Sequence, residues 1–353
     1  MSGDRAHDFS ERIRAAAADG TPLRMVGGGS KAWFGRAATG ELFDVSGHAG
    51  ILDYEPRELV IRARAGTPLA EIEATLAQAG QSLPFEPPAF GECATLGGTL
   101  ACGLSGPARP YVGSARDHVL GARIVNGRGE ILSFGGQVMK NVAGYDVSRL
   151  MVGGLGTLGL LLDVSLKVLP RPERHVTLVK DCNPRDAVAA MNGWAGKPLP
   201  LSATCFDGNR LLVRLSGSEA AVQQAAQRLG GDAWPEADRF WADLREHRLA
   251  FFAGQGPLWR LAVPSAGSPL DLPGKWLIEW GGGQRWLVAD LEPERVRAAA
   301  RAVGGHATLF RGGDRTGEVF QPLAPALLAL HRRLKQAFDP AGIFNPGRMY
   351  GAL

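Results

Sequence analysis

The sequence contains few cysteines and no long apolar run, and these shortages exclude several classes of protein. Its four cysteines, Cys93, Cys102, Cys182 and Cys205, show neither C-x-x-C spacing nor a matching histidine pair, which argues against a zinc site or a disulfide framework. No segment approaches the roughly 18 consecutive apolar residues that cross a bilayer. The first residues lead into a charged amphipathic stretch, unlike a signal peptide. We therefore expect reduced thiols, no metal and no membrane span.

A large excess of charge of either sign is also missing. The 353 residues include 39 basic and 35 acidic side chains, a net charge of +4, without a long basic run. Nucleic-acid binding therefore has little support, whereas a basic surface that docks an acidic partner subunit is still compatible with the sequence. Apolar residues make up 45% and charged residues 21% of the chain, the composition of an ordered globular protein. At roughly 150 residues per domain, the length predicts two or three domains.

Glycine is the residue in excess. Glycine (48) and proline (23) together form about a fifth of the chain, against roughly 12% in average proteins. Because the glycines follow no G-X-Y period, a collagen-like structure is excluded. They must instead mark tight turns or backbone that lies close to a ligand.

Periodicity and turn signals predict a mixed α+β chain that changes character near residue 170. In the first part we expect a helix at residues 9–18, a second helix capped by Thr67 and ending near Gly80, a hairpin over 119–134, and strands at 23–26, 59–63 and 160–169. Beyond Pro170-Arg171-Pro172, helices are expected at 184–194, 219–229, 293–303 and 326–338. Strand candidates between them predict an antiparallel sheet with helices on one face.

Three glycine-rich segments lie in the first half of the chain. Residues 25–31 read MVGGGSK after a predicted strand, and consecutive glycines leave backbone N–H groups uncovered, a pattern that can wrap a phosphate. Residues 94–103 alternate small hydroxyl and apolar residues, and we expect them to lie flat along an extended ligand. Residues 154–159 formally match G-x-G-x-x-G. Each segment alone is also typical of a plain turn or core loop, but together they indicate a long ligand with a pyrophosphate centre.

The match at residues 154–159 does not predict a Rossmann fold. A Rossmann fingerprint opens a helix, whereas residues 160–169 predict a strand. We therefore expect the ligand to be held outside a Rossmann fold. Another glycine triple, residues 281–283, follows Trp280 and is interpreted as a hairpin turn.

The order and spacing of these segments resemble the FAD-binding domain of the vanillyl-alcohol oxidase (PCMH-type) superfamily. The segments are MVGGGSK (25–31), ATLGGTL (94–100), YVGSARDHVLG (111–121), KNVAGYD (140–146) and GTLG (156–159). The ending FDPAGIFNPGR (338–348) resembles that of the glycolate oxidase and D-lactate dehydrogenase branch. Within that branch, the short length, the segment 140–146 and a divergent middle region resemble the FAD-binding E subunits of bacterial glycolate oxidase (glycolate dehydrogenase).

This resemblance implies a fold and a cofactor. The fold would be α+β, with a PCMH-type two-subdomain FAD-binding domain at residues 1–170 and a smaller α+β cap domain on the substrate side at 171–320. Residues 321–353 would form a C-terminal helix and tail that pack back on the FAD domain. FAD would be held noncovalently, because Ser30 and Lys31 offer neither the histidine nor the cysteine that covalent attachment needs. Cys93 and Cys102 are the remaining candidates for such a bond.

The resemblance also assigns cofactor-binding residues. Gly27, Gly28, Gly29 and Ser30 would wrap the FAD pyrophosphate, the segment 95–99 would run beneath the flavin and its ribityl chain, residues 156–159 would lie near the adenosine half, and Asn345 would lie beside the isoalloxazine. The complete candidate set is Val26, Gly27, Gly28, Gly29, Ser30, Lys31, Pro88, Thr95, Leu96, Gly97, Gly98, Thr99, Gly103, Asp117, Val119, Gly121, Gly156, Thr157, Gly159 and Asn345.

The function that the resemblance implies is that of a subunit. The chain would bind FAD in a glycolate oxidase complex that oxidises glycolate to glyoxylate, with a larger FAD-binding catalytic subunit and an iron–sulfur subunit that receives the electrons from flavin. It would be cytoplasmic, or peripheral to the inner membrane through these partners. Two rival interpretations are a self-sufficient FAD-dependent dehydrogenase for a small 2-hydroxy acid such as D-lactate, and a non-catalytic scaffold that keeps only the flavin fold.

No catalytic residue is identified by the sequence. The His-x-x-His and Gly-Asp/Glu-Gly-His clusters of the catalytic relatives are missing. Arg109, Arg311 and Arg348 are candidates for binding a substrate carboxylate, because guanidinium groups pair with carboxylates. A partner-docking face is expected around three tryptophans of the second half, Trp234, Trp241 and Trp259.

Overall fold

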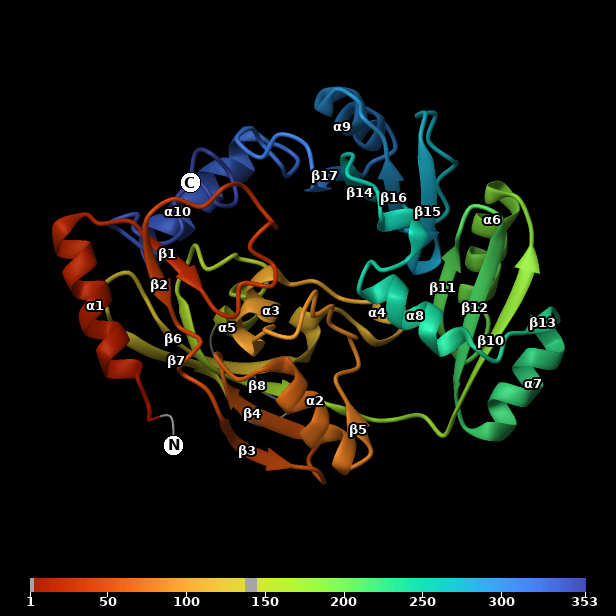
Figure 1. Ribbon diagram of the computed structural model, residues 1–353, viewed down its shortest axis with the longest axis horizontal. Coiled ribbons are helices and arrows are strands. Elements are labelled where there is room, and N and C mark those ends of the chain that lie inside the picture. Colours follow the sequence, from red (N-terminus) through yellow and green to blue (C-terminus); the bar gives the residue numbers. More distant parts are fainter. Residues whose placement is uncertain (1–2, 137–144) are drawn as a thin grey trace.

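The chain folds around two large β-sheets that lie side by side (Figure 1). The computed structural model describes residues 3–136 and 145–353. Residues 140–144 of the segment KNVAGYD, which contributed to the resemblance, lie outside the described residues. In the part of the chain that is described, no helix is long and apolar enough to cross a membrane.

The first sheet has five antiparallel strands in the order β3-β4-β8-β6-β7. These are β3 (Ile51–Glu55), β4 (Val60–Arg64), β6 (Val119–Val125), β7 (Ile131–Gly135) and β8 (Leu160–Lys167). The central strand β8 is buried on both faces: Leu161 and Val164 pack in the core beneath α2 (Leu69–Gln78) and α3 (Leu96–Cys102), whereas Leu160 and Leu162 pack against α1 (Ala6–Asp19). Burial on both faces explains why residues 160–169 form a nearly continuous apolar run.

A small parallel pair beside this sheet carries the first glycine loop. Strand β1 (Leu23–Val26) pairs with β2 (Glu41–Asp44), and both belong to the core that α1 covers. Further short elements complete the first half: β5 (Gln81–Ser82) paired with β9 (Leu169–Pro170), α4 (Arg109–Val112), the 3-10 helix η1 (Ala115–His118) and α5 (Val147–Leu150).

The second sheet has eight antiparallel strands in the order β13-β10-β12-β11-β15-β16-β14-β17. Its strands are β10 (Arg174–Asp181), β11 (Leu201–Phe206), β12 (Arg210–Gly217), β13 (Asp232–Ala233), β14 (Leu258–Ala262), β15 (Lys275–Glu279), β16 (Gln284–Val288) and β17 (His306–Arg311). One face packs against α6 (Pro184–Ala195), α7 (Glu219–Leu229) and α9 (Pro293–Ala302). The short 3-10 helices η2 (Ala250–Phe252) and η3 (Trp280–Gly282) lie in its connections.

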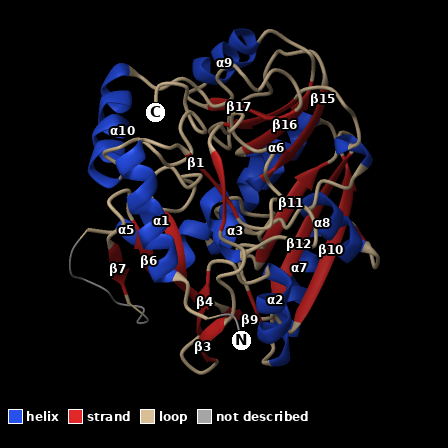
Figure 2. Ribbon diagram, turned by 60° about the vertical axis from the view of Figure 1, so that its left-hand side comes forward, coloured by secondary structure: helices blue, strands red, loops and turns tan. Residues whose placement is uncertain are grey.

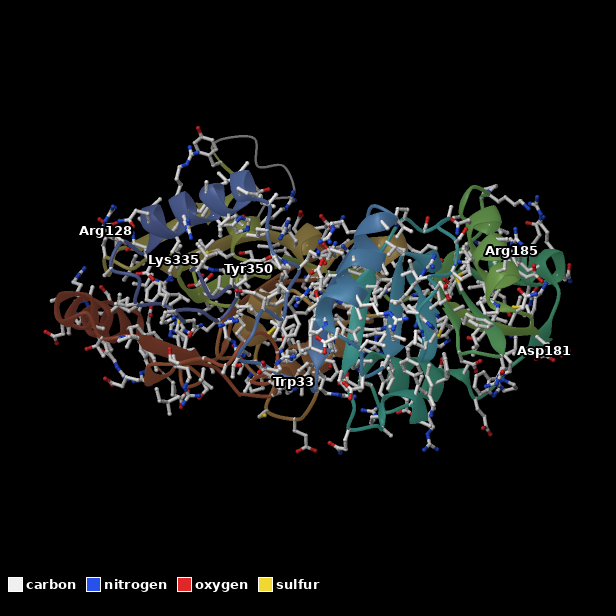
Figure 3. The ribbon with its side chains drawn as sticks, turned by 90° about the horizontal axis from the view of Figure 1, so that it is seen from above. Trp33, Arg128, Asp181, Arg185, Lys335 and Tyr350 are labelled. Carbon is white, nitrogen blue, oxygen red and sulfur yellow. The ribbon has the colours of Figure 1, made fainter. Side chains whose placement is uncertain are left out.

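The other face of the second sheet meets the first half of the chain. Helix α8 (Ala237–Arg245) packs on this face, and the same apolar cluster takes in Phe34, Leu104 and Leu155 from the first half. Trp33, labelled in Figure 3, contacts both Phe90 and Phe310 edge-on, with ring centroids 5.2 and 5.1 Å away. Loops of the first half of the chain therefore contribute to the apolar core on this face of the second sheet.

The last helix and tail return to the first half. Helix α10 (Pro325–Phe338) lies outside the first sheet, and the following residues reach β1, where Leu23 forms a parallel bridge with Phe344 (Figures 1 and 2). Lys335, labelled in Figure 3, donates to Asp339 Oδ2 and to the carbonyls of Thr157 and Phe344, all within 2.8 Å. The predicted α+β architecture, with its returning tail, is confirmed; the domain boundary at residue 170, between β9 and β10, stays a prediction.

Three expectations about local structure were wrong. Residues 96–102 form helix α3, because Thr95 accepts from the Gly98 N–H as N-cap, so the stretch is not laid flat. Thr67 does not cap α2: its hydroxyl exchanges hydrogen bonds with Gly50 instead, and the helix starts after Pro68. Helices also lie on both faces of the second sheet, since α8 occupies the face opposite α6.

The expected tryptophan docking face is also wrong. Trp241 and Trp259 are buried in two different cores on opposite faces of the second sheet. The Trp241 indole N–H donates to the Thr177 hydroxyl at 2.9 Å. Trp241 lies on α8, which covers one face of the sheet, whereas Trp259 on β14 points to the other face, so the two side chains cannot form one surface.

Candidate cofactor site

The first glycine loop leaves β1 with its backbone donors unpaired. Among the described residues, the N–H groups of residues 27–31 donate no hydrogen bond to protein atoms. The loop packs so closely on the neighbouring chain that a Cβ at Gly28 would lie 1.4 Å from the Cys93 carbonyl oxygen, and one at Gly27 would lie 2.5 Å from Thr95 Oγ1. Five successive free N–H groups in a glycine turn form a concave anion site of the kind that binds phosphates.

Cationic side chains surround the same loop. Arg24, Lys31 and Arg348 line one cavity with it. Lys31 is buried, and its Nζ donates to the Ala89 carbonyl at 3.0 Å. Burial lowers the pKa of Lys31, and the nearby Cys102 and Glu246 oppose that shift. Because none of these cations is paired with a carboxylate within 4 Å in the described part of the chain, an anionic group such as a pyrophosphate would complete the charge balance.

Helix α3 forms the floor of the site. Its first turn packs against the end of β4, where Gly97 N–H donates to the Ala65 carbonyl at 2.7 Å and a Cβ at Gly97 would approach the Ala65 Cβ to 2.7 Å. Glycine at this position lets the helix lie directly on the sheet. The N-terminal turn of α3 thereby borders the cavity through Thr95, Gly97 and Gly98.

Asn345 joins the loop 154–159 to β1. Its Oδ1 accepts from the Met25 N–H at 2.8 Å, and its Nδ2 donates to the Leu155 carbonyl at 2.7 Å. A Cβ at Gly156 would come within 2.7 Å of the Asn345 Nδ2, so glycine is needed for this close approach. One side chain from the tail therefore fixes two walls of the site.

Two adjoining cavities result, and they share eight lining residues, among them Gly27, Thr95, Gly98 and Asn345. One, with a volume of about 900 Å³ that includes its opening to solvent, contains the glycine loop and the cationic side chains. The other, about 590 Å³ and likewise open to solvent, is lined mainly by apolar residues, including Met151, Leu158 and Leu161. A polar, cationic chamber beside an apolar one suits an elongated ligand with a charged centre and a flat ring.

Twelve of the candidate cofactor residues line these cavities. They are Val26, Gly27, Gly28, Gly29, Ser30, Lys31, Thr95, Gly97, Gly98, Gly156, Gly159 and Asn345.

The other eight candidates lie elsewhere. Leu96 and Thr99 point into the core, Gly103 ends α3, and Pro88 lines a different cavity. Asp117 caps η1, Val119 and Gly121 belong to β6, and the Thr157 hydroxyl donates to the Gly154 carbonyl.

Several lining residues were not predicted from the sequence. Val45, Ala65 and Met151 are apolar residues whose only distinguishing property is their place next to the glycine loops in space. Arg24 directly precedes the motif MVGGGSK, and a basic residue beside that motif was the available signal. Arg348, the last residue of FDPAGIFNPGR, was expected to bind a substrate carboxylate and instead lines the cavity of the glycine loop.

Cys102, which lies at the site, is a thiol with little nucleophilic character. Cys102 lines the larger cavity, and burial raises its pKa to about 11. Cys93 is exposed and lines neither cavity. Since the thiolate is the reactive form, Cys102 is poorly suited to form a covalent bond at neutral pH.

The three arginine candidates are dispersed. Arg348 lies at the cavity and donates to the Ala32 and Arg36 carbonyls. Arg311 donates to the Phe252 carbonyl at 2.5 Å, and Arg109 lies over the Trp280 ring at 4.4 Å. These three side chains therefore do not converge on one carboxylate.

Replacing Asn345 with alanine should weaken both the fold and the site. The change leaves the Met25 N–H and the Leu155 carbonyl without partners, which we expect to lower the free energy of unfolding by about 3 kcal/mol. Urea denaturation of the cofactor-free chain measures this loss. Asn345→Asp keeps the acceptor for the Met25 N–H but sets a carboxylate oxygen against the Leu155 carbonyl, so it should lose stability as well. Equal stability of Asn345→Ala and the unchanged chain would contradict the role given to this side chain.

Comparisons with known proteins bear on the same regions. The FAD binding domain family matches residues 4–135, and the family "FAD linked oxidases, C-terminal domain" matches residues 312–349. Glycolate oxidase subunit GlcE of Escherichia coli (strain K12) is 50% identical over 350 residues, which cover 99% of each chain. Glycolate oxidase subunit GlcD of Bacillus subtilis (strain 168) is 31% identical over 165 residues, 46% of this chain and 35% of that protein.

A solved structure shares the fold. A structure of alkyldihydroxyacetonephosphate synthase superimposes with a TM-score of 0.66 at 17% identity, over 96% of this chain and 75% of that one. At this identity the likeness concerns the fold alone.

Proposed function

This chain belongs to the family of the glycolate oxidase E subunit, among the PCMH-type FAD-linked oxidoreductases, and we propose that it is the FAD-binding subunit of a complex that oxidises glycolate to glyoxylate. It is an FAD-dependent oxidoreductase that acts on a hydroxy acid. The observation that carries the proposal is the run of unpaired N–H groups at residues 27–31, which opens into a cavity edged by three cations.

The chain's own residues fit FAD. The backbone of residues 27–31 would donate to the pyrophosphate, with Arg24, Lys31 and Arg348 balancing its charge. The apolar cavity around Met151 and Leu161 would bury a ring of FAD away from water. FAD, when bound, supplies the acceptor for a hydride from the α-carbon of the hydroxy acid. The protein supplies the orientation, the charge and the exclusion of water.

Attachment is proposed to be noncovalent. The protonated state favoured for the Cys102 thiol supports this, and so does the exposed Cys93, which is not among the residues that line either cavity. Acid precipitation tests it: flavin released into the supernatant is the expected result, and flavin that stays with the pellet would contradict it.

Two relatives are named as subunits of glycolate oxidase, which supports partners for this chain. From the family resemblance we propose that a larger FAD-binding catalytic subunit and an iron–sulfur subunit complete the assembly, and that electrons pass from the flavin of this chain to the iron–sulfur partner. Through these partners the chain would be peripheral to the inner membrane.

The visible absorption spectrum of the purified chain tests the cofactor proposal. We expect flavin bands that correspond to about one FAD per chain. Glycolate is then added in the absence of oxygen. Bands that persist unbleached support a relay subunit that needs its partners. Bleaching would identify a self-sufficient 2-hydroxy-acid dehydrogenase, and no bands even after reconstitution with FAD would leave only the scaffold interpretation.

A further inference from the structure

The end of helix α8, in the second half of the chain, reaches a loop beside the cofactor site. Glu246 directly follows the helix, and its side chain is only 7% exposed. Its Oε2 accepts the backbone N–H of Phe90 at 2.8 Å, and its two oxygens share the N–H of Ala89 at 3.1 and 3.2 Å. A carboxylate from the second half of the chain therefore fixes residues 89–90 of the first half.

The peptide unit that Glu246 binds also binds Lys31. The Ala89 carbonyl belongs to the same peptide unit as the Phe90 N–H, and it accepts from Lys31 Nζ at 3.0 Å. Because the two hydrogen bonds lie at opposite ends of one planar amide, each polarises the amide and strengthens the other. Glu246 and Lys31 are thus a carboxylate and an ammonium group that one peptide unit connects.

The backbone on both sides of this contact has an uncommon conformation. Phe90 has a φ of 51°, and His247, which follows Glu246, has a φ of 55°; residues other than glycine seldom adopt such values. The Phe90 ring meets Trp33 and His247 edge-on, with ring centroids 5.2 and 5.1 Å away. Conformations of this kind persist only where the surrounding structure holds them, and they are frequent at ligand sites. The hydrogen bonds to Glu246 are part of what holds residues 89–90 in place.

Few charged groups face Lys31. In the described ranges 3–136 and 145–353, no carboxylate oxygen lies within 4 Å of its Nζ. Burial lowers the pKa of Lys31, and Cys102, Glu246 and Cys93 oppose that shift. Glu246 is the carboxylate among these three groups, so removal of its charge should lower the pKa of Lys31 further. The other charged side chains at the cavity are Arg24 and Arg348.

Arg245 offsets the charge of Glu246 only in part. Its Nε donates to Glu246 Oε1 at 2.9 Å, whereas Oε2 is the oxygen nearest the Phe90 N–H. The Arg245 side chain is 31% exposed, so water screens this ion pair more than it screens the buried carboxylate. The charge of Glu246 therefore still acts on the peptide unit and on Lys31 beyond it.

We propose that Glu246 is a positioning residue for the cofactor: through the peptide unit of residues 89–90, it holds the Lys31 ammonium group at the wall of the cavity that contains the glycine loop. That the anion bound there is the pyrophosphate of FAD rests on the proposed function. Glu246 itself lines neither cofactor cavity. The second half of the chain would then contribute to FAD binding without touching FAD through this residue.

A double-mutant cycle on FAD affinity tests this role. The purified chain and its variants are freed of flavin, and the dissociation constant of FAD is measured by calorimetric titration at neutral pH. We expect Glu246→Gln to weaken FAD binding about tenfold, the size typical for loss of a hydrogen bond to a charged group. In a Lys31→Met chain, the same substitution should change the affinity by less than about twofold, because no ammonium group is left to hold.

The cycle distinguishes a positioning role from a merely structural one. If Glu246 served only to stabilise residues 89–90, Glu246→Gln would weaken FAD binding by the same factor with and without Lys31. That result would overturn the proposal, and so would an undiminished affinity of the Glu246→Gln chain. The urea midpoint of each variant shows whether it has folded.

Asp243→Asn is the matched control. It removes a carboxylate from the same helix, but Asp243 pairs with Arg248 and Arg239 instead of the loop beside the cofactor site. We expect this variant to bind FAD as the unchanged chain does.

The ionisation of Lys31 provides a second readout that needs no cofactor. The chain has seven lysines, so labelling of lysine Cε with carbon-13 gives few NMR signals, and the one that Lys31→Met removes belongs to Lys31. We expect the pKa of Lys31 in the FAD-free chain to fall by about one pH unit in Glu246→Gln, the size expected for two opposite charges several ångströms apart. It should not change in Asp243→Asn. The same Lys31 pKa in the Glu246→Gln chain and the unchanged chain would overturn the proposal.

The two readouts separate this proposal from the proposed function. If the chain takes up no FAD, the proposed function fails, and a Lys31 pKa that depends on Glu246 still supports the link between the two residues. If the chain retains FAD but neither readout links Glu246 to Lys31, the positioning role is overturned and the FAD assignment stays intact.

Discussion

A Gly28→Ala chain should fail to retain FAD. The added Cβ would lie 1.4 Å from the Cys93 carbonyl oxygen and 2.5 Å from its carbonyl carbon, and both are backbone atoms that cannot rotate away. The loop 27–31 must therefore shift, which redirects the N–H groups that face the cavity. We expect FAD content below about a tenth of the unchanged chain and a loss of about 3 kcal/mol in unfolding free energy. Absorbance of the purified protein and urea denaturation measure the two effects.

The matched control for this substitution is Gly193→Ala. Gly193 lies in α6, and a Cβ there would meet no atom within 4 Å. Alanine is favoured over glycine inside a helix by about 0.5–1 kcal/mol, so this variant should keep FAD and be at least as stable. A Gly28→Ala chain with full FAD content would contradict this prediction, because it would show that the loop can move away from Cys93 and still bind FAD.

The second large effect is expected at Asp339, which is buried at the end of α10. Its carboxylate accepts from Lys335 Nζ at 2.7 Å and from the N–H groups of Ile343 and Phe344 at 3.2 and 2.8 Å. Asp339→Ala leaves the Lys335 ammonium, only 11% exposed, without its counterion and frees the tail. We expect the free energy of unfolding to fall by about 3–5 kcal/mol. Urea denaturation measures this loss of stability. We also expect a lower FAD content, because the tail carries Asn345.

A double variant separates charge from hydrogen bonding at this position. Lys335→Met with Asp339→Leu removes both charges and fills the same space, so it should recover more than half of the loss. If the double variant is as unstable as Asp339→Ala, the hydrogen bonds to the tail account for the loss instead. A change below about 1 kcal/mol in the single variant would contradict the structural role of the pair.

The sequence predicted the architecture well where local signals coincide. The helix expected at residues 219–229 is α7 with the same bounds, because Ser218 caps its start and Gly230 follows its end. The glycine triple 281–283 turns between β15 and β16, and the glycine loop 27–31 faces the cavity. In each case a few adjacent residues determine the backbone.

The parts that escaped prediction depend on contacts between distant segments. Residues 96–102 became a helix because the Thr95 hydroxyl reaches Gly98 and the helix packs on Ala65, more than 25 residues earlier in the chain. The polar cluster inside the second sheet arises because sheet pairing sets Arg260 opposite Trp286 and Glu279 opposite Gln284. None of these positions forms a motif along the chain, so only the register of β14, β15 and β16 brings them together.

The bond between Met25 and Asn345 spans 320 positions of sequence. During synthesis, β1 and the glycine loop emerge from the ribosome long before the residue that fixes them against the loop 154–159. Contacts of such high sequence separation form late in folding, since a long chain must first close. A nascent or interrupted chain that lacks residues 339–348 lacks Asn345, which lines both the cationic and the apolar cavity. We therefore expect flavin to bind only after the tail has been synthesised, and a truncated chain to fail to retain it.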